Sequence, residues 1–155
     1  MQDEKSLNLK SLGKEIKNYD FNYKNDYLEN IERVFEKLPL IKIVAPEFTC
    51  LCPVTGQPDF ATIKINYVPN KYMVESKSLK LYLFSFRNIG IFHEDVVEKI
   101  LNDLINLLDP FYIEVIGHFN ARGGISITPF ANYAKPGTEY VDWVKYRKIK
   151  EMGNN

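Results

Sequence analysis

The sequence has few of the features that mark specialised classes of protein. No apolar run among its 155 residues reaches the roughly 18 residues that a membrane-spanning helix needs. No apolar stretch follows the polar N-terminus, as it would in a secretory signal. The formal net charge is zero, which argues against a general nucleic-acid binder with surplus Lys and Arg. We therefore expect a cytoplasmic globular protein, and the length suits one domain.

Cysteine and histidine are also scarce. The two cysteines, Cys50 and Cys52, are separated by one residue, which is too close for an unstrained disulfide, so we expect both thiols to be reduced. Only His93 and His118 are available to complete a zinc site with them, and their spacing is not that of a zinc motif. The sequence therefore predicts no metal site, and we interpret Cys50 as a structural residue, with a redox neighbour of Cys52 as the alternative.

The apolar pattern predicts an α+β fold. Alternating apolar residues predict four strands, at 40–45, 61–68, 113–118 and 125–128. Apolar residues at helical spacing predict two helices, at 79–86 and 93–108. Ser76 or Ser78 is expected to cap the first helix, and Asp109-Pro110 to end the second. The element order predicts a four-stranded antiparallel sheet with a helix pair on one face.

The ends of the chain have weaker patterns. We interpret residues 1–38 as an N-terminal arm lying on a catalytic domain of residues 39–155. Apolar residues between Tyr27 and Leu38 recur at helical spacing and predict a short helix in the arm, whereas residues 140–150 are expected to be partly helical at best. An open four-stranded sheet has two bare edges that must be covered, so we expect subunits to join into a ring.

One segment combines a thiol with a carboxylic acid. Cys52 and Asp59 flank a stretch that Pro53, Gly56 and Pro58 make bend, so the two side chains can return to one neighbourhood. A thiolate beside an acid can attack an unsaturated carbon and protonate the product. By composition alone, Cys52 is at least as well explained as a small buried apolar residue, and Asp59 as the end of a turn.

Several sequence blocks carry a family resemblance. They are LCPVTGQPDF (51–60), ESKSLKLY (75–82), FSFRN (84–88), FHED (92–95), RGGISI (122–127) and NYAKPG (132–137). Together they resemble the NADPH-dependent 7-cyano-7-deazaguanine reductases, the nitrile reductases of queuosine biosynthesis. The length is similar to that of the short, single-domain form of these enzymes.

The resemblance implies a fold, an assembly and a reaction. The fold is the tunnelling fold, in which subunits join their sheets into a barrel with the active site at the interface, and two pentameric rings stack. The reaction reduces a nitrile to a primary amine with two NADPH, and another enzyme then inserts the product into tRNA. Cys52 would form a covalent thioimide with the nitrile, and Asp59 would donate the proton.

The resemblance also implies the residues that bind the substrate. Glu94 would accept the ring N–H and exocyclic amine of the guanine-like base, and His93 would contact the base beside it. Val74, Glu75 and Ser76 would contact the substrate across the subunit interface. Considered alone, Glu94 is well explained as an acid at a helix N-terminus.

The cofactor prediction depends on the resemblance alone. Lys77, Lys80 and Arg122 are the candidates to bind the phosphates of NADPH, because Arg or Lys is the expected partner of its 2′-phosphate. No Gly-x-Gly-x-x-Gly follows a predicted strand, so a Rossmann site is not expected. Without the resemblance, the two lysines are explained as solvated residues of a helix face.

Two other functions remain open. A zinc-dependent pterin or purine cyclohydrolase on the same fold would need a Cys/His/Cys ligand set. A non-catalytic purine-binding ring would keep Glu94 but would not need Cys52 or Asp59. We also expect four phenylalanines to lie mostly in the core, namely Phe84, Phe86, Phe92 and Phe111. One of the four is expected to stack on the base.

Overall fold

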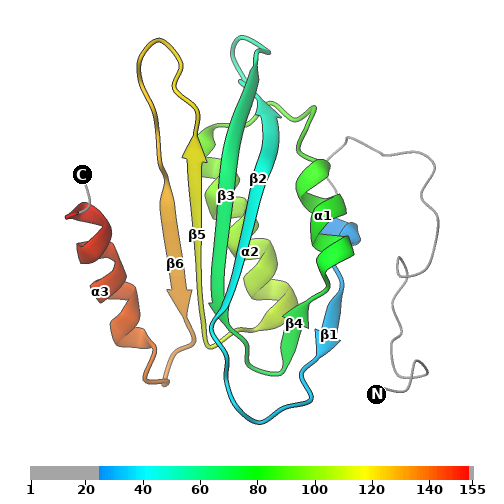
Figure 1. The fold of residues 1–155 in the computed structure, drawn as a ribbon, viewed down its shortest axis with the longest axis vertical. Helices are drawn as coiled ribbons and strands as arrows, with labels where there is room; N and C mark the ends of the chain where they lie inside the picture. The colour runs from blue at the N-terminus through cyan, green and yellow to red at the C-terminus, as the bar shows by residue number, and fades with distance from the viewer. Residues whose placement is uncertain (1–24, 154–155) are drawn as a thin grey trace.

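A four-stranded antiparallel sheet forms the centre of the computed structural model, which describes residues 25–153 (Figure 1). The strand order is β2-β3-β5-β6. The strands are β2 (Ile41–Leu51), β3 (Pro58–Val68), β5 (Tyr112–Phe119) and β6 (Phe130–Ala134). The structure confirms the predicted α+β class. Within the described residues, no helix has the length and apolar character to span a membrane.

The hairpin of β2 and β3 is longer than predicted and contains one irregularity. Alternate side chains of β3 are buried as the pattern predicted, among them Ile63 and Ile65. The register shifts between Ala45 and Phe48, around Pro46, whose nitrogen has no hydrogen to donate to the ladder. Beyond this point the pairing resumes and continues to the end of both strands.

Two helices cover one face of the sheet (Figure 1). They are α1 (Ser76–Phe84) and α2 (His93–Leu108). Their apolar side chains join those of the strands in one core, which includes Tyr82, Phe86 and Leu104. The second helix ends as predicted, because Asp109 adopts a left-handed conformation with φ of 44° directly before Pro110.

The cap of α1 differs from the prediction. Glu75 is the N-cap residue, and its carboxylate accepts hydrogen bonds from the backbone amides of Lys77 (2.9 Å) and Ser78 (2.7 Å). Ser76 and Ser78 lie inside the helix, and the Ser78 hydroxyl donates to the Glu75 carbonyl instead. One carboxylate satisfies two of the amides that a helix start leaves without partners, so neither serine is needed as a cap.

The described part of the arm pairs with the domain. Strand β1 (Asn30–Glu32) forms a two-stranded antiparallel sheet with β4 (Tyr72–Val74), and a 3-10 helix (Asn25–Tyr27) precedes it. The short helix predicted between Tyr27 and Leu38 is therefore wrong, because backbone pairing with β4 overrides the helical spacing. The rest of the arm, residues 1–24, lies outside the described residues. The division into arm and domain stays a prediction.

The fourth strand of the sheet lies further along the chain than predicted. It is β6, whereas residues 125–128 belong to the loop before it. The carbonyls of Ile127 and Pro129 accept hydrogen bonds from the amides of Phe119 and Gly117 on β5. Pro129 cannot donate in return, so the pairing is one-sided there and the regular ladder begins only after it.

The C-terminal segment forms a complete helix, α3 (Val141–Met152), which lies beside β6 (Figure 1). It is more helical than predicted because a long-range ion pair holds it. Arg147 donates to both carboxylate oxygens of the buried Glu114 on β5, at 2.8 and 3.1 Å. The same carboxylate accepts from Asn66 at 2.8 Å and from the hydroxyl of Tyr112 at 2.7 Å.

We predict that Arg147→Met destabilises the protein by roughly 3 kcal/mol, because it leaves the buried Glu114 carboxylate without its cation. Urea unfolding measures this loss. The control Lys148→Met changes an exposed residue of the same helix and is expected to stay within about 0.5 kcal/mol of the wild type. The double variant Glu114→Gln/Arg147→Met is expected to recover part of the loss. Equal stability of Arg147→Met and the control would mean that the ion pair between Arg147 and Glu114 does not hold α3 in place.

Candidate active site

The turn between β2 and β3 is closed by its own backbone. The Cys52 amide donates to the Gln57 carbonyl at 2.8 Å, and the Gly56 amide donates to the Cys52 carbonyl at 2.9 Å. Gly56 has φ of 70°, a conformation that glycine adopts without the strain other residues incur. In the paired strands below the turn, Cys50 lies opposite Asp59. The tight turn therefore fixes the backbone of Cys52 above this pair.

Asp59 is the centre of a cluster that comes from three parts of the chain. Its side chain is buried, and its Oδ1 lies 2.8 Å from Nε of Arg122, in the loop between β5 and β6. Its Oδ2 lies 3.0 Å from Nε2 of His93, the first residue of α2. These last two atoms are not aligned for a hydrogen bond, and both are buried without a hydrogen-bond partner. The cluster therefore keeps a donor or acceptor position available for a ligand.

The ring of His93 is held in place by an aromatic neighbour. It stacks on Phe119, at the end of β5, with 3.8 Å between ring centroids and 9° between planes. Sequence reasoning missed Phe119, because a phenylalanine ending an apolar strand has no local signal of a site. The stack fixes the plane of the imidazole, and the position of His93 at the start of α2 sets it beside Asp59.

Cys52 is the more reactive of the two thiols. Hydrogen bonds from the side chain and backbone of Thr55, from Arg122 and from the Val54 backbone lower the pKa of Cys52 from 9.0 to about 6. Thr55 was not predicted as a site residue. The available signal was its position, a hydroxyl three residues after the cysteine in a tight turn. Near neutral pH this thiol is mostly ionised, which is the state that a nucleophile requires.

Cys50 is in the opposite situation. It is fully buried in the core, and burial together with the charge of Asp59 raises the pKa of this thiol to about 12. It therefore remains protonated at neutral pH and has no access to solvent. Both cysteines are free thiols in the structure. This environment supports the interpretation of Cys50 as a structural residue.

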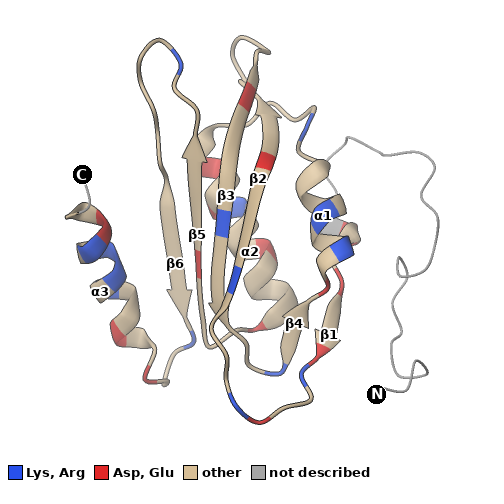
Figure 2. Ribbon diagram, in the orientation of Figure 1, with Lys and Arg blue, Asp and Glu red and all other residues tan. Residues whose placement is uncertain are grey.

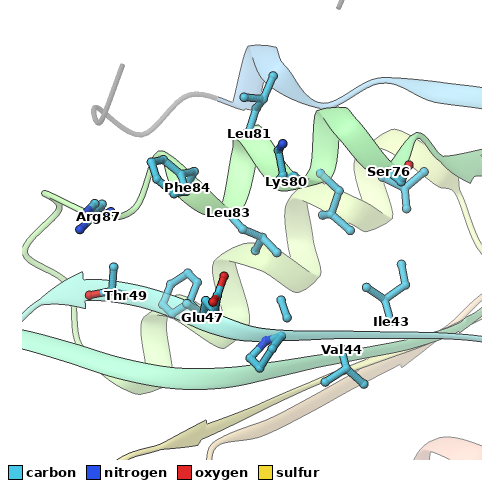
Figure 3. Close-up of a pocket in the computed structure, with 15 residues that line it drawn as sticks. Ile43, Val44, Glu47, Thr49, Ser76, Lys80, Leu81, Leu83, Phe84 and Arg87 are labelled. Atoms are coloured by element: carbon cyan, nitrogen blue, oxygen red, sulfur yellow. The ribbon is translucent and has the colours of Figure 1, made fainter. Parts of the chain in front are cut away.

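A separate cavity of about 500 Å³ lies between α1 and β2 (Figure 3). Three of the predicted binding residues line it, namely Val74, Ser76 and Lys80. In Figure 3, Leu83 points from α1 towards β2, and Glu47 points from β2 towards α1. None of the four residues at the Asp59 cluster and the turn lines this cavity, that is, Cys52, Asp59, His93 and Arg122. The predicted residues thus fall into two groups on one chain.

The cavity has a cationic border. Helix α1 carries Lys77 and Lys80 and no acidic residue, as Figure 2 shows, and Arg87 follows shortly after the helix. Lys80 and Arg87 both line the cavity, whose remaining walls are largely apolar. Arg122, predicted together with the two lysines, lies instead at Asp59. The structure therefore separates the three cations that the sequence analysis had grouped.

The remaining predicted residues differ in their exposure. Glu94 is exposed in the first turn of α2, next to His93. Glu75 is buried, and its carboxylate is engaged in the cap of α1. Phe86 lies in the core as expected, but Phe92 is 54% exposed and Phe84 is 36% exposed, so the prediction of a mostly buried group is wrong for these two. The reason is their position at helix ends, beyond the packed face.

No metal-binding cluster is formed within residues 25–153. In this range, no group of three or more His, Cys, Asp and Glu side chains is arranged to hold a metal ion. His118, which the sequence offered as a partner of the cysteines, lies on β5 opposite Thr62.

We predict that iodoacetamide modifies Cys52 with a rate that rises through pH 6 and levels off by about pH 7.5. The lowered pKa gives this sign, because the thiolate fraction falls as the pH drops below about 6. Mass spectrometry of the peptide that contains both cysteines measures the rate. Cys52→Ala provides the blank, in which the buried Cys50 is expected to stay unmodified. A midpoint above pH 8 would contradict the activation described here.

Comparison with solved structures supports the fold. The crystal structure of the archaeosine synthase QueF-Like in the apo form matches with a TM-score of 0.59 and 20% sequence identity. The match covers 64% of this chain and 98% of that chain. At this level of identity the likeness extends to the arrangement of helices and strands only.

Comparison with known sequences finds relatives of higher identity. The profile of a family described as "QueF-like protein" matches residues 58–138. Relatives from Bacillus licheniformis and Bacillus subtilis are 58% identical over 139 residues, which is 89% of this chain and 84% of theirs. A relative from Staphylococcus aureus is 52% identical over 147 residues, 94% of this chain and 89% of its own. All three are named NADPH-dependent 7-cyano-7-deazaguanine reductase. The chain belongs to the QueF-like protein family, as the resemblance of its sequence blocks implied.

Proposed function

We propose that the protein reduces the nitrile of 7-cyano-7-deazaguanine to the primary amine 7-aminomethyl-7-deazaguanine, in queuosine biosynthesis. Two NADPH and two protons are consumed for each nitrile. The observation that carries the proposal is the activated thiol of Cys52, whose pKa is lowered to about 6 beside the buried Asp59 and Arg122. The names of relatives that share more than half of their aligned residues with this chain support the same reaction.

The first chemical step uses the thiol and the carboxylic acid. The Cys52 thiolate attacks the nitrile carbon, a carbon–sulfur bond forms, and one π bond of the nitrile breaks. The nitrile nitrogen takes a proton from Asp59. The product is a covalent thioimide with a carbon–nitrogen double bond. A nitrile resists direct attack by hydride, and the thioimide does not, so this addition makes the reduction possible.

His93 is placed to supply the proton that Asp59 donates. Arg122 occupies Oδ1 of the carboxylate, and Oδ2 faces Nε2 of His93 at 3.0 Å. Because Oδ2 has no hydrogen-bond partner, it is the oxygen that can carry the proton towards the substrate. An imidazole can act as a general acid, so His93 can return the proton to Asp59 after each transfer.

The base would bind at the exposed start of α2. The Glu94 carboxylate, next in sequence to His93, can accept the ring N–H and exocyclic amine of the base together. The exposed ring of Phe92, just before His93, provides an apolar face on which a flat heterocycle can stack. Val74, Glu75 and Ser76 would complete the base site from a second subunit.

The residues of α1 suit the phosphates of NADPH. Lys77 and Lys80 project from a helix without acidic residues, and Lys80 lies at a cavity that Arg87 also lines. Cations of this kind are the expected partners of phosphate oxygens. When bound, NADPH supplies the hydride for the reduction. Arg122, the third residue predicted for this role, lies at Asp59 and away from the two lysines of α1.

The two groups of site residues suggest a shared active site. The sheet of one chain ends in two edges, at β2 and at β6. We propose that β2 of one subunit joins β6 of the next, so that the α1 cavity of one subunit meets the Cys52 cluster of its neighbour. The expected assembly is a decamer of two stacked pentamers. We propose the cytoplasm as its compartment, where the two free thiols stay reduced.

We predict that the purified protein oxidises NADPH only when 7-cyano-7-deazaguanine is added, as followed by nicotinamide absorbance. Cys52→Ala is expected to lower kcat by at least about 10³-fold, because no thioimide can form. Asp59→Asn is expected to lower it by about 10²-fold to 10⁴-fold, because an amide of the same shape cannot donate the proton. Cys50→Ala is the matched control and should retain turnover.

Other outcomes identify the alternatives. Without NADPH, mass spectrometry should show a nitrile adduct that depends on Cys52, and an adduct that depends on Cys50 instead would refute the choice of nucleophile. Tight binding of the base without turnover would favour a non-catalytic purine-binding ring. A requirement for added zinc would favour a cyclohydrolase-like enzyme.

We predict that mixed oligomers of Cys52→Ala and Lys80→Gln recover activity that neither variant shows at low NADPH concentration. Each shared site needs Cys52 from one subunit and Lys80 from the next, so some interfaces in the mixture contain both wild-type residues. Light scattering before and after mixing measures the mass of the assembly. Activity that equals the average of the two separate variants would mean that each site lies within one subunit.

A further inference from the structure

The side chain of Arg122 starts from a tightly fixed backbone. The amides and carbonyls of Arg122 and Ile125 bond to each other at 3.0 Å in both directions. Between them, Gly123 and Gly124 have φ of 57° and 78°, the left-handed conformations of a two-residue hairpin turn. No atom lies within 4 Å of a Cβ built on either glycine, so the glycines serve the turn and not a close contact. The turn presents Arg122 towards β3.

The guanidinium bridges two chemical groups of the site. Its Nε lies 2.8 Å from Oδ1 of the buried Asp59. Its interaction with Cys52 raises the pKa of Arg122 and lowers that of the thiol. The arginine is 43% exposed, so it reaches the two groups from the solvent side.

We propose that Arg122 is a positioning residue for the addition of the thiol to the nitrile, a step in which no cofactor takes part. This inference rests on the proposed function. The guanidinium holds the Cys52 sulfur as a thiolate and fixes the Asp59 carboxylate beside it, so that both groups meet the nitrile in the correct arrangement. The sequence analysis assigned Arg122 to the cofactor phosphates together with Lys77 and Lys80, and the two assignments predict different behaviour.

Arg122 is the cation that offsets the negative charge of the Cys52 thiolate. Asp59, from β3, places a second acidic group beside the thiol, and Cys50, from β2, remains a neutral thiol because its pKa is raised to about 12. His93, from α2, faces Asp59. A thiolate next to a carboxyl group is favoured by a cation that contacts both. Arginine suits this position because its planar fork of donors can bond two acceptors at once, which a lysine ammonium does less well.

The test measures the addition step without NADPH. Arg122→Gln removes the charge and keeps the approximate length of the side chain, Arg122→Lys keeps the charge without the fork, and Lys80→Gln is the comparison variant. For each, mass spectrometry follows the rate of the 7-cyano-7-deazaguanine adduct, and iodoacetamide labelling of Cys52 is measured against pH. Circular dichroism confirms that each variant is folded.

We expect Arg122→Gln to slow adduct formation at pH 7 by at least about 10-fold and to move the labelling midpoint up by about one pH unit or more. Arg122→Lys should give an adduct rate and a labelling midpoint between those of Arg122→Gln and the wild type. If Arg122→Gln does not fold, Arg122→Lys takes its place in the test. Lys80→Gln should leave both measurements unchanged while it raises KM for NADPH.

Two results separate the failure of this inference from that of the proposed function. If the wild type forms the adduct and Arg122→Gln forms it at the same rate with the same labelling midpoint, the positioning role is wrong. A raised KM for NADPH in that variant would then assign Arg122 to the cofactor phosphates. If the wild type forms no adduct and shows no turnover, the proposed function itself fails, whatever Arg122 does.

Discussion

The pairing of β2 with β3 is the constraint on which the site depends. Paired residues of an antiparallel sheet project to the same face, so the pairing places Asp59 and Cys50 together on the face that α2 covers. Asp59 precedes Ala61 on that face and is the first buried residue of β3, and it lies beside His93 at the start of α2. A slip of one residue would turn the Asp59 carboxylate to the opposite face and away from His93.

Three carboxylates are buried within residues 25–153, and their hydrogen bonds distinguish their roles. The carboxylate of Glu75 accepts two backbone amides of α1. That of Glu114 accepts hydrogen bonds from Arg147, Asn66 and Tyr112. Asp59 alone among the three keeps a buried oxygen without a hydrogen-bond partner in the described structure. A buried carboxylate with an unused oxygen is costly for stability, which is consistent with a role in chemistry.

The Asp59 cluster also shows how one cation can serve two acidic groups. Arg122 reaches the buried carboxyl group of Asp59 from a loop that is open to solvent. The turn that carries Cys52 adds hydrogen bonds from Thr55, so the thiolate does not depend on the arginine alone. Separate elements thus supply the acid, the nucleophile and the cation, and only their packing brings these groups together.

The elements that depend on local pattern could be predicted from the amino-acid sequence. These include the alternation along β3, the apolar face of α2 and the bent segment from Cys52 to Asp59, because period and turn residues act over a few neighbours. The other features depend on tertiary packing. It joined Arg147 to Glu114, 33 residues away, and so completed α3. It also placed Arg122 and His93 at Asp59, because contacts between distant residues depend on how sheets and helices pack and leave no periodic signal in the chain.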